Sequence, residues 1–405
     1  MAAPGFVFAD PKPSPDNFDT FNPQDVFADA KVNANAVPEK IPPLVRTPPV
    51  MTLDEVLGAA AVAQIQSAGQ LVFHSVGDTG GIKEPKHQFA VADAMAADLH
   101  GRRLAKNRPA LFYHLGDVVY YFGQEKYYYD QFYDPYRDYD APIFAIPGNH
   151  DAVRFTGEPV QFSLEPFVNN FCTKTPVKNS VAGGIARTTM TQPGVYFALD
   201  APFARIIGLY SNTSEGATEG MISGSIIGNE QVTFLIDRLN ELAGERKKGR
   251  TRALILATHH PPFTGSSQHV PSPGMLRDID GACAQTGVWP DLVLSGHAHL
   301  YERYTRTMKA DGRQIAYVVA GNGGYFNLSG FKKGQSGAKP KPGVTGTDAK
   351  GNRLTLEYFD DSAFGFLRVT VTAAKIKCQF MALQPSGRVR VANTTTVTLA
   401  THKVS

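Results

Sequence analysis

Five short apolar segments, each followed at once by a cluster of polar residues, constrain the fold of this chain most strongly. The segments are LVFHSV (71–76), ALFYHL (110–115), PIFAI (142–146), ALILAT (253–258) and DLVLS (291–295). Each is too short for a helix and rich in β-formers, so we expect five buried strands. Between and before them, helical periodicity predicts helices at 53–68, 88–105 and 229–245, the last with Asn229 as its N-cap. Strands alternating with helices predict an α/β fold.

The rest of the chain indicates one domain preceded by an arm. Residues 1–52 are rich in Pro, Asp and Asn and show little periodicity, which predicts an extended, Pro-rich N-terminal arm. Residues 53–405 contain neither a sequence repeat nor a clean linker, so we expect them to form a single domain. Within this domain, residues 353–400 have the pattern of antiparallel strands around a Pro-Ser-Gly turn.

The charge balance argues against a nucleic-acid-binding platform. Lys and Arg number 40 against 37 Asp and Glu, and the net charge is +3. Two local basic runs, at 246–252 and 331–342, could attract an anionic partner, but solvated turns are the simpler interpretation. No apolar run reaches the roughly 18 residues of a membrane helix, so no membrane span is expected.

Cysteine usage and the N-terminus leave the compartment open. The three cysteines form no CxxC pair, and one disulfide with one free thiol is compatible with them. The opening MAAPGFVFADPKPSP lacks a basic region followed by a long apolar stretch. The sequence is therefore compatible with a secreted or periplasmic protein whose signal peptide has been removed, and otherwise with a cytoplasmic one.

The polar clusters after the five predicted strands carry oxygen and nitrogen donors without thiolates. They read GDTG (77–80), GDVVY (116–120), PGNHD (147–151), HHPP (259–262) and GHAH (296–299). Ligand sites of α/β sheets gather at the carboxyl ends of strands, so these clusters could meet in one crevice. The donor types favour catalytic Fe, Mn or Zn. Seven candidate donors are too many for one ion with an open position, whereas two ions sharing one carboxylate suit phosphoester hydrolysis.

These five motifs, in this order, resemble the calcineurin-like metallophosphoesterase superfamily and, within it, the purple acid phosphatases. The family pattern is DxG, GDxxY, GNH followed by an acid, a His-x-Pro strand end, and GHxH. The last motif continues here as LYER (300–303), similar to the GHxHxYER of the plant-type branch, whereas VGDTGG and LGDVVYYFG are similar to the small mammalian-type branch. The resemblance covers residues 70–326.

Two positions favour the purple acid phosphatase subgroup. Most of the superfamily has DxH in the first motif, where the His ligates a metal, and this chain has Gly80 at that position. A purple acid phosphatase lacks that His and gains a Tyr in GDxxY, whose phenolate binds ferric iron. Tyr120 occupies the second position, so the chain makes both changes together. The competing interpretation is that Tyr120 packs as one aromatic residue among many in a Tyr-rich stretch.

The resemblance implies two metal ions, Fe(III) and a divalent Fe, Zn or Mn. Asp78, Asp117, Tyr120 and His299 would hold the ferric ion, while Asn149, His259 and His297 would hold the divalent ion, with Asp117 bridging both. His150 and His269 are the expected catalytic residues, and both are expected to bind substrate together with Asn149. His269 lies ten residues beyond His259, near the offset of a substrate-contacting or proton-donating histidine of the plant-type branch.

Other polar residues of the motifs are expected to have supporting roles. His260 is expected to support the site or to pack beside it, and Asp151 to orient His150 or to cap the chain locally. His74 and His114 lie inside apolar strands and are expected to be buried core histidines.

The resemblance also implies the fold and the reaction. The fold would be a four-layer α/β/β/α sandwich with two mixed sheets, in which residues 53–405 form the catalytic domain and residues 353–400 complete the second sheet. A small-molecule phosphomonoester would be hydrolysed by a metal-bound hydroxide, as in an acid phosphatase, with inorganic phosphate as product and inhibitor. A phosphodiesterase acting on nucleotides, cyclic nucleotides or lipid head groups is the alternative. A phosphate- or metal-sensing protein is a further alternative, but such a protein would be expected to lack a ligand.

Overall fold

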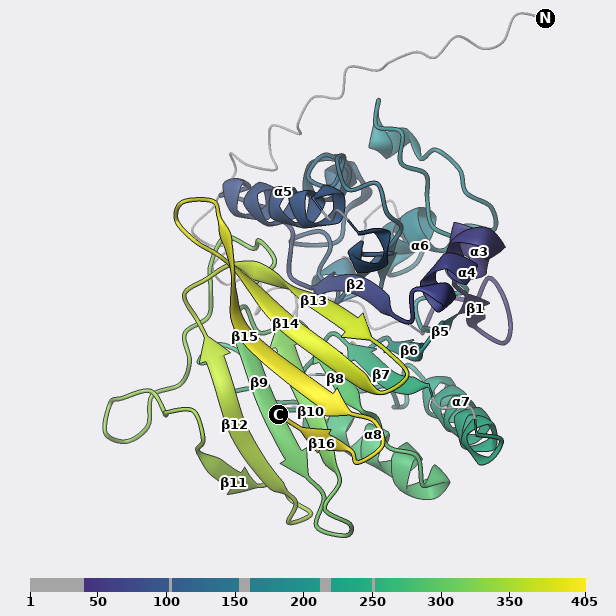
Figure 1. Ribbon diagram of the computed structural model, residues 1–405. Coiled ribbons are helices and arrows are strands. Elements are labelled where there is room, and N and C mark those ends of the chain that lie inside the picture. The colour runs from purple at the N-terminus through teal and green to yellow at the C-terminus, as the bar shows by residue number, and fades with distance from the viewer. Residues whose placement is uncertain (1–39, 102–103, 153–160, 212–219, 250–251) are drawn as a thin grey trace, which may run out of the picture.

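Two mixed β-sheets face each other at the centre of the protein, as the computed structural model shows (Figure 1). The structure describes residues 40–101, 104–152, 161–211, 220–249 and 252–405. Within these residues one sheet contains nine strands: β1 (Val50–Thr52), β5 (Phe197–Ala201), β6 (Ala204–Leu209), β7 (Ala253–Thr258), β8 (Leu292–Ser295), β9 (Tyr301–Thr307), β10 (Gln314–Ala320), β11 (Thr345–Thr347) and β12 (Arg353–Asp360). The other contains seven: β2 (Leu71–Val76), β3 (Phe112–His114), β4 (Ile143–Ala145), β13 (Gly365–Val371), β14 (Lys375–Leu383), β15 (Val389–Thr398) and β16 (Lys403–Val404).

Each sheet has a parallel part that the chain enters through helices and an antiparallel part built from hairpins. The strand orders are β1-β5-β6-β7-β8-β10-β9-β12-β11 and β16-β15-β14-β13-β2-β3-β4. The neighbours β6, β7 and β8 are parallel, as are β2, β3 and β4, whereas β13, β14 and β15 are antiparallel. These pairings confirm the predicted α/β fold with two mixed sheets.

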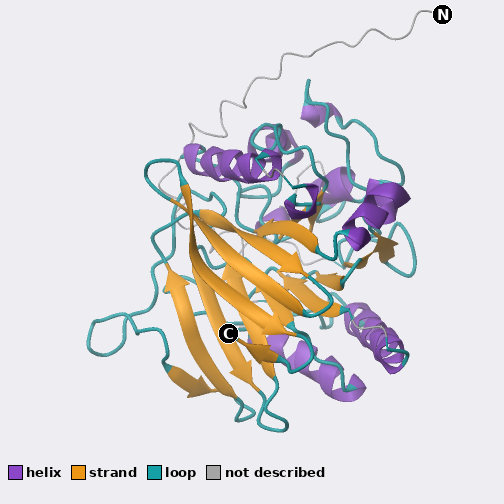
Figure 2. Cartoon of the chain, viewed as in Figure 1, coloured by secondary structure: helices purple, strands orange, loops and turns teal. Residues whose placement is uncertain are grey.

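Helices cover the outer faces of the two sheets (Figure 2). The helices are α3 (Asp54–Leu57), α4 (Ala59–Ser67), α5 (Lys86–His100), α6 (Glu165–Phe171), α7 (Glu230–Lys247) and α8 (Pro273–Thr286), with shorter helical turns η2 (Ala105–Asn107), η3 (Glu125–Tyr127), η4 (Tyr129–Tyr133), η5 (His150–Ala152) and η6 (Ser180–Ala182). Helix α5 lies over the seven-stranded sheet, and α7 and α8 lie side by side along the nine-stranded sheet. The result is the predicted four-layer order of helix, sheet, sheet and helix.

The hydrophobic core between the sheets explains why the strand segments read as continuous apolar runs. Phe73 of β2, Ile255 of β7 and Leu294 of β8 are fully buried in this inner core, which draws on both sheets. The alternate residues of the same strands face the outer helices, for example Leu256, which belongs to a second core with Leu239 of α7. Burial on both faces stabilises each such side chain by about 1.5–3 kcal/mol.

Several local expectations differ from the structure in detail. The helix predicted at 53–68 is interrupted at Gly58, whose φ of +80° separates α3 from α4. Asn229 precedes α7 as predicted, but its side chain makes no capping hydrogen bond. The C-terminal strands do not stay together either, because β12 pairs with β9 in the nine-stranded sheet while β13 pairs with β2 in the other.

The end of the predicted N-terminal arm belongs to the folded unit. Strand β1 (Val50–Thr52) pairs in parallel with β5 at the edge of the nine-stranded sheet. Residues 1–39 of the arm lie outside the described residues. The division of the chain into an arm and a catalytic domain therefore stays a prediction.

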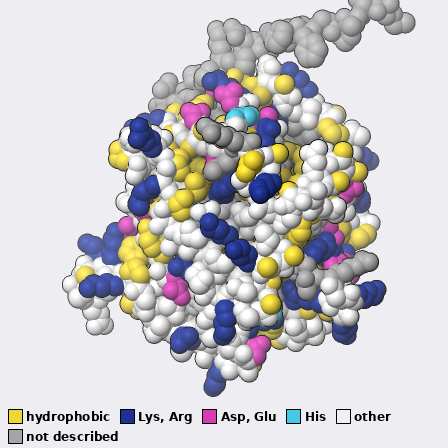
Figure 3. Space-filling view, in the orientation of Figure 1, with side chains coloured by type: hydrophobic (Ala, Val, Ile, Leu, Met, Phe, Trp, Pro, Cys, Tyr) yellow, Lys and Arg dark blue, Asp and Glu magenta, His cyan; other side chains and the backbone are white. Residues whose placement is uncertain are grey.

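Three features of the described part of the chain are its cysteines, its basic side chains and the lengths of its helices. Cys172, Cys283 and Cys378 are buried and free. Lys and Arg side chains are dispersed over the face drawn in Figure 3 without forming one continuous basic stripe. In the described ranges, none of the helices combines the length and the apolar character needed to cross a membrane.

Candidate metal centre

The predicted polar clusters meet where the carboxyl ends of two sets of parallel strands approach each other. β2, β3 and β4 belong to one sheet, and β7 and β8 to the other. Side chains from the two sets are in contact, since Nε2 of His259, directly after β7, lies 3.0 Å from Oδ1 of Asn149, which follows β4. Carboxyl ends of parallel strands are where α/β proteins place their ligand sites.

A first group of donors surrounds the hydroxyl group of Tyr120. Its oxygen lies 2.9 Å from Oδ2 of Asp117, which it can reach as a hydrogen-bond donor. It also lies 3.2 Å from Oδ1 of Asp78 and 3.2 Å from Nε2 of His299. Ligand atoms of Asp78, Asp117 and His299 lie within 4.8 Å of one another. Carboxylate, phenol and imidazole donors at this spacing can bind a single hard metal ion.

A second group of donors lies beside the first. Oδ1 of Asn149 is 3.0 Å from Nε2 of His259 and 3.0 Å from Nδ1 of His297. The Nδ1 atom of His259 is 2.9 Å from the carbonyl oxygen of Leu115, to which it can donate its proton. This hydrogen bond fixes the tautomer and leaves Nε2 free to act as a metal ligand.

Asp117 lies between the two groups. Its Oδ2 atom is 2.9 Å from the Tyr120 hydroxyl oxygen and 3.4 Å from Nε2 of His259. Its Oδ1 atom accepts a hydrogen bond of 2.9 Å from the backbone N–H of His150, which fixes the orientation of the carboxylate. Asp117 is therefore in contact with both groups of donors.

The acidic side chains of this centre are buried close together, and their pKa values are shifted. Burial raises the pKa of Asp78, and burial together with the carboxylates of Asp117 and Asp78 keeps the pKa of Tyr120 well above its ordinary value. Burial by itself would also raise the pKa of Asp117, but His259 and His150 outweigh it and hold that pKa below the usual range. Bound cations would favour the anionic forms of all three groups, so the donor set fits a metal centre.

Gly80 explains how a tyrosine can occupy this position. A Cβ atom at residue 80 would lie 2.6 Å from Cδ2 of Tyr120 and 2.4 Å from Oε1 of Gln131. The ring of Tyr120 therefore fills the space into which a side chain at position 80 would project. The glycine in the first motif and the tyrosine in the second motif depend on each other sterically.

A buried polar network holds the two motifs in place. Gln131, in η4, pairs with both backbone groups of Tyr120: Oε1 accepts from the N–H and Nε2 donates to the carbonyl, each at 2.8 Å. His114 accepts from the N–H of Gly116 at 3.1 Å through Nδ1 and contacts the hydroxyl of Thr79 at 2.8 Å through Nε2. These bonds connect the loops that carry Asp78, Asp117 and Tyr120.

The two expected catalytic histidines lie next to the donor groups. Nδ1 of His150 lies 2.8 Å from the carbonyl oxygen of Tyr121, and its ring centroid is 4.4 Å from that of Tyr120. The ring of His269 lies 4.4 Å from that of His297 and 5.1 Å from that of His299. His269 therefore lies beside both donor groups, on the loop that follows the HHPP motif.

The remaining motif residues take supporting positions. Of the two roles expected for Asp151, the hydrogen bonds match local capping: its carboxylate accepts from the backbone N–H groups of Val118, Val119 and Gly148 at 2.9–3.1 Å. His260 packs its ring 4.3 Å from that of His297, and burial together with His259 keeps its pKa well below the ordinary value. His260 therefore supports the site from behind.

His74 and His114 are both fully buried, as expected for core histidines. His74 contacts Asp98 at 3.0 Å and Tyr139 at 3.1 Å, remote from the donor groups. His114 differs, because its contacts with Gly116 and Thr79 make it part of the support of the candidate centre.

Tyr325 lies beside the first donor group although it belongs to none of the five motifs. Its ring centroid lies 4.3 Å from that of Tyr120 and 4.3 Å from that of His299. The signal was present, because GNGGYF (321–326) follows the apolar strand β10 in the same way that the five motifs follow their strands. β10 is parallel to β8, so its carboxyl end lies at the same edge of the sheet.

Comparisons with known proteins agree with this geometry at the level of the family. Residues 73–301 match the sequence model of a family described as calcineurin-like phosphoesterase. No match was found among the curated proteins.

Three solved structures illustrate the structural similarity. The structure described as "GAP50 the anchor in the inner membrane complex of Plasmodium" is 14% identical, with 80% of this chain and 87% of that chain covered and a TM-score of 0.49. The structure of PhoD is 14% identical, with coverages of 83% and 71% and a TM-score of 0.46. A dimetal phosphatase from Danio rerio is 11% identical, with coverages of 81% and 99% and a TM-score of 0.41. At these identities and scores, the three structures say nothing about the activity of this chain.

Proposed function

The chain belongs to the calcineurin-like phosphoesterase family, which implies metal-dependent phosphoester hydrolysis at a dinuclear centre, and we propose that it is a phosphomonoesterase of the purple acid phosphatase type. The proposal concerns the subgroup, the metals and the preferred substrate, which family membership leaves open.

The observation that carries the proposal is the position of the Tyr120 hydroxyl group. It lies within 3.2 Å of Asp78, Asp117 and His299, and the ring that carries it packs over Gly80, where a Cβ atom would approach Cδ2 to 2.6 Å. A tyrosine that merely packed in the core would not need its hydroxyl oxygen among two carboxylates and an imidazole. A phenolate is a hard anionic ligand, which favours Fe(III) on this side of the centre.

Seven side chains would hold the two ions. Asp78, Tyr120 and His299 would bind the ferric ion, Asn149, His259 and His297 would bind a divalent Fe, Zn or Mn ion, and Asp117 would bind both. When bound, the metal pair would lower the pKa of water and neutralise the charge of the phosphoryl oxygens.

The protein itself would orient the substrate and move the proton of the leaving group. His150 and Asn149 would contact the phosphoryl oxygens of a bound monoester. The bond from phosphorus to the ester oxygen would break as the oxygen of the attacking water bonds to phosphorus, and the water would release one proton to the solvent. His269, beside His297 and His299, would deliver a proton to the leaving alkoxide and so prevent the build-up of charge on it.

A visible absorption spectrum of the iron-loaded protein, compared with that of Tyr120→Phe, tests the assignment directly. We expect a broad tyrosinate-to-iron(III) band in the wild type and its loss in Tyr120→Phe, which keeps the ring but removes the oxygen. Metal analysis of both proteins is the control for loading. An iron-loaded, hydrolytic wild type without the band would reduce Tyr120 to a packing residue.

Rates on 4-nitrophenyl phosphate and bis(4-nitrophenyl) phosphate test the substrate class. A monoesterase should turn over the first substrate faster. A phosphomonoester carries two negative charges, spread over its phosphoryl oxygens, and these match two cations and His150. A clear preference for the diester would favour the alternative, a phosphodiesterase with the same ligands.

A further inference from the structure

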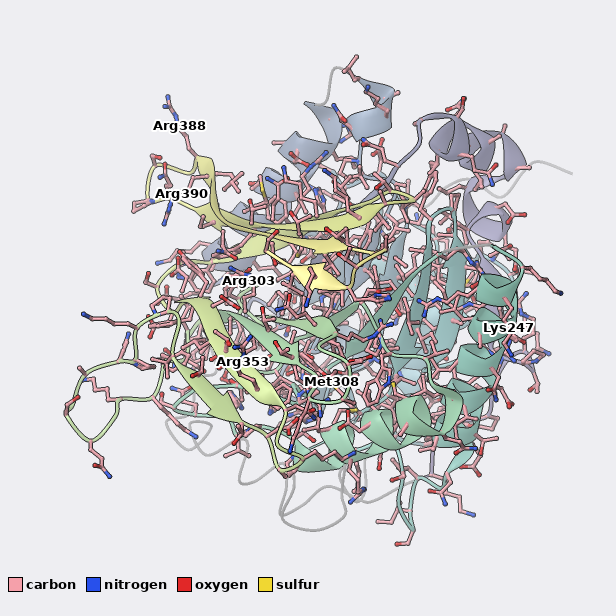
Figure 4. The ribbon with its side chains drawn as sticks, turned by 60° about the horizontal axis from the view of Figure 1, so that its bottom comes forward. Lys247, Arg303, Met308, Arg353, Arg388 and Arg390 are labelled. Carbon is pink, nitrogen blue, oxygen red and sulfur yellow. The ribbon has the colours of Figure 1, made fainter. Side chains whose placement is uncertain are left out.

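Strand β9 directs the side chains that follow the GHAH motif alternately to its two faces. The Tyr301 hydroxyl donates to Oδ1 of Asn393 at 3.0 Å, and Nη1 of Arg303 donates to the hydroxyl of Thr395 at 3.1 Å. Both partners lie on β15, so these two side chains point toward the seven-stranded sheet, and Figure 4 shows Arg303 between the two sheets. Because strand side chains alternate, Glu302 must point to the opposite face.

Glu302 meets the loop that carries His269. Its Oε1 atom accepts a hydrogen bond of 2.8 Å from the backbone N–H of Gly265. The side chain is 0% exposed, and burial raises its pKa to about 8. A buried carboxyl group destabilises the fold unless its polar atoms are used, and an apolar residue would pack there at lower cost.

A short turn transmits the position of Gly265 to His269. The hydroxyl of Ser266 accepts hydrogen bonds of 3.2 Å from the backbone N–H groups of Gln268 and His269. The N–H of Ser266 is in turn bound at 3.0 Å by the hydroxyl of Thr264. Residues 264–269 therefore form one hydrogen-bonded unit, in which Gly265 and His269 cannot move independently without losing bonds.

The other side of this unit is connected to the candidate metal ligands. Ser329 donates its backbone N–H to the carbonyl oxygen of His299 at 2.8 Å and its hydroxyl to Oε1 of Gln268 at 3.0 Å. The N–H of Ser267 also donates to the carbonyl of Gly330 at 2.8 Å. The unit thus has two anchors: residues 329–330 on one side and Glu302 of β9 on the other.

We propose that Glu302 is a positioning residue that holds the 264–269 loop, and through it the imidazole of His269, against the candidate metal centre. The proposal rests on the proposed function in one respect, namely that His269 acts on the leaving group. In the described part of the chain Glu302 contacts this loop at Gly265 and Thr264, and it acts through Gly265 and Ser266.

Three variants separate positioning from a merely structural role. Glu302→Met keeps the volume but removes the acceptor, Glu302→Gln keeps an acceptor oxygen, and His269→Ala removes the group that is positioned. We expect Glu302→Met to lower kcat by about 10-fold to 100-fold with both metals retained, as expected when a reacting group is displaced slightly. Glu302→Gln should stay within about threefold of wild type, because its amide oxygen can accept from Gly265.

The decisive comparison is the double variant His269→Ala/Glu302→Met. If Glu302 acts through His269, the double variant should lose no more kcat than His269→Ala alone. Multiplicative losses, or a loss of metal in Glu302→Met, would overturn the proposal, because Glu302 would then act on the fold or on the metal ligands.

Backbone-amide hydrogen exchange in the metal-free protein supplies a readout that does not depend on activity. We expect the Gly265 amide to be protected in wild type and in Glu302→Gln, and to exchange faster in Glu302→Met. Should Glu302→Met fail to fold, an unprotected Gly265 amide in the wild type would by itself refute the proposal. If the Gly265 amide is protected but the wild-type protein has no phosphoesterase activity, the proposed function is contradicted, whereas the proposal that Glu302 anchors the loop still holds.

Discussion

The ring of Tyr120 lies so close to Gly80 that a Cβ atom at position 80 would approach Cδ2 of Tyr120 to 2.6 Å. Gly80→Ala should therefore displace Tyr120 or Gln131. Overpacking of this kind destabilises by about 1–3 kcal/mol, and it should also weaken any tyrosinate absorption. Urea unfolding of the metal-free protein and a visible spectrum of the iron-loaded protein would measure both effects. Gly281→Ala in α8, where nothing lies within 4 Å, is the matched control and should not destabilise.

Asp117 contacts donor side chains of both groups, whereas Asp78 contacts the donor atoms around Tyr120 and reaches the second group through the backbone N–H of His297, at 2.7 Å. We expect Asp117→Asn to lose metal from both sites and Asp78→Asn to lose it mainly from the Tyr120 side, because a neutral amide is a weaker ligand. Metal analysis after dialysis would distinguish the two variants. Equal stoichiometry in both would contradict a shared carboxylate at position 117.

His114 should make the metal-free protein sensitive to acid. Burial lowers the pKa of His114 to about 3, below its ordinary value of 6.5. Between these values the unfolded chain binds more protons than the native state, so His114 contributes stability above pH 6.5 that is lost as the pH falls toward 3. The free energy of unfolding should fall by up to about 1.4 kcal/mol per pH unit from this residue. His114→Gln, which can still bond to Gly116 and Thr79, should show a shallower slope between pH 4 and 6, and an unchanged slope would refute the assignment.

A buried ion pair away from the centre predicts a large loss of stability. The guanidinium of Arg306 is fully buried and binds Asp280 through two hydrogen bonds of 2.6 and 2.7 Å and Asp348 at 2.7 Å. Arg306→Met should destabilise by about 3–5 kcal/mol, because it leaves buried carboxylates without their partner. Arg353→Met on β12, an exposed position labelled in Figure 4, should change the free energy of unfolding by less than about 0.5 kcal/mol. A small effect of Arg306→Met in the same denaturation experiment would show that solvent reaches Asp280.

The sequence alone determined the features that depend on residues adjacent in the chain, namely the strands and the polar turns that follow them. The apolar runs at 71–76 and 253–258 form the strands β2 and β7 with the predicted bounds, since a segment that is apolar at most positions of both faces is buried on both faces. The polar residues after each strand could also be identified from the sequence, because the chain must turn at a strand end and polar side chains are common in turns. The fold class followed from the alternation of these elements, and the donor residues followed from the five motifs. Their role as metal ligands stays a prediction.

The tertiary structure decided which strand ends meet and which other residues join them. Whether β2–β4 and β7–β8 share a sheet depends on long-range pairing, and the structure places them in two facing sheets. Gln131 and Glu302 support the site through contacts that the five motifs do not encode, and Tyr325 joins it because β10 pairs with β8. The same holds for β12, which leaves the other C-terminal strands because its pairing with β9 is a property of the packed sheets. Local sequence thus specifies elements and chemistry, whereas packing between distant segments specifies their assembly into one site.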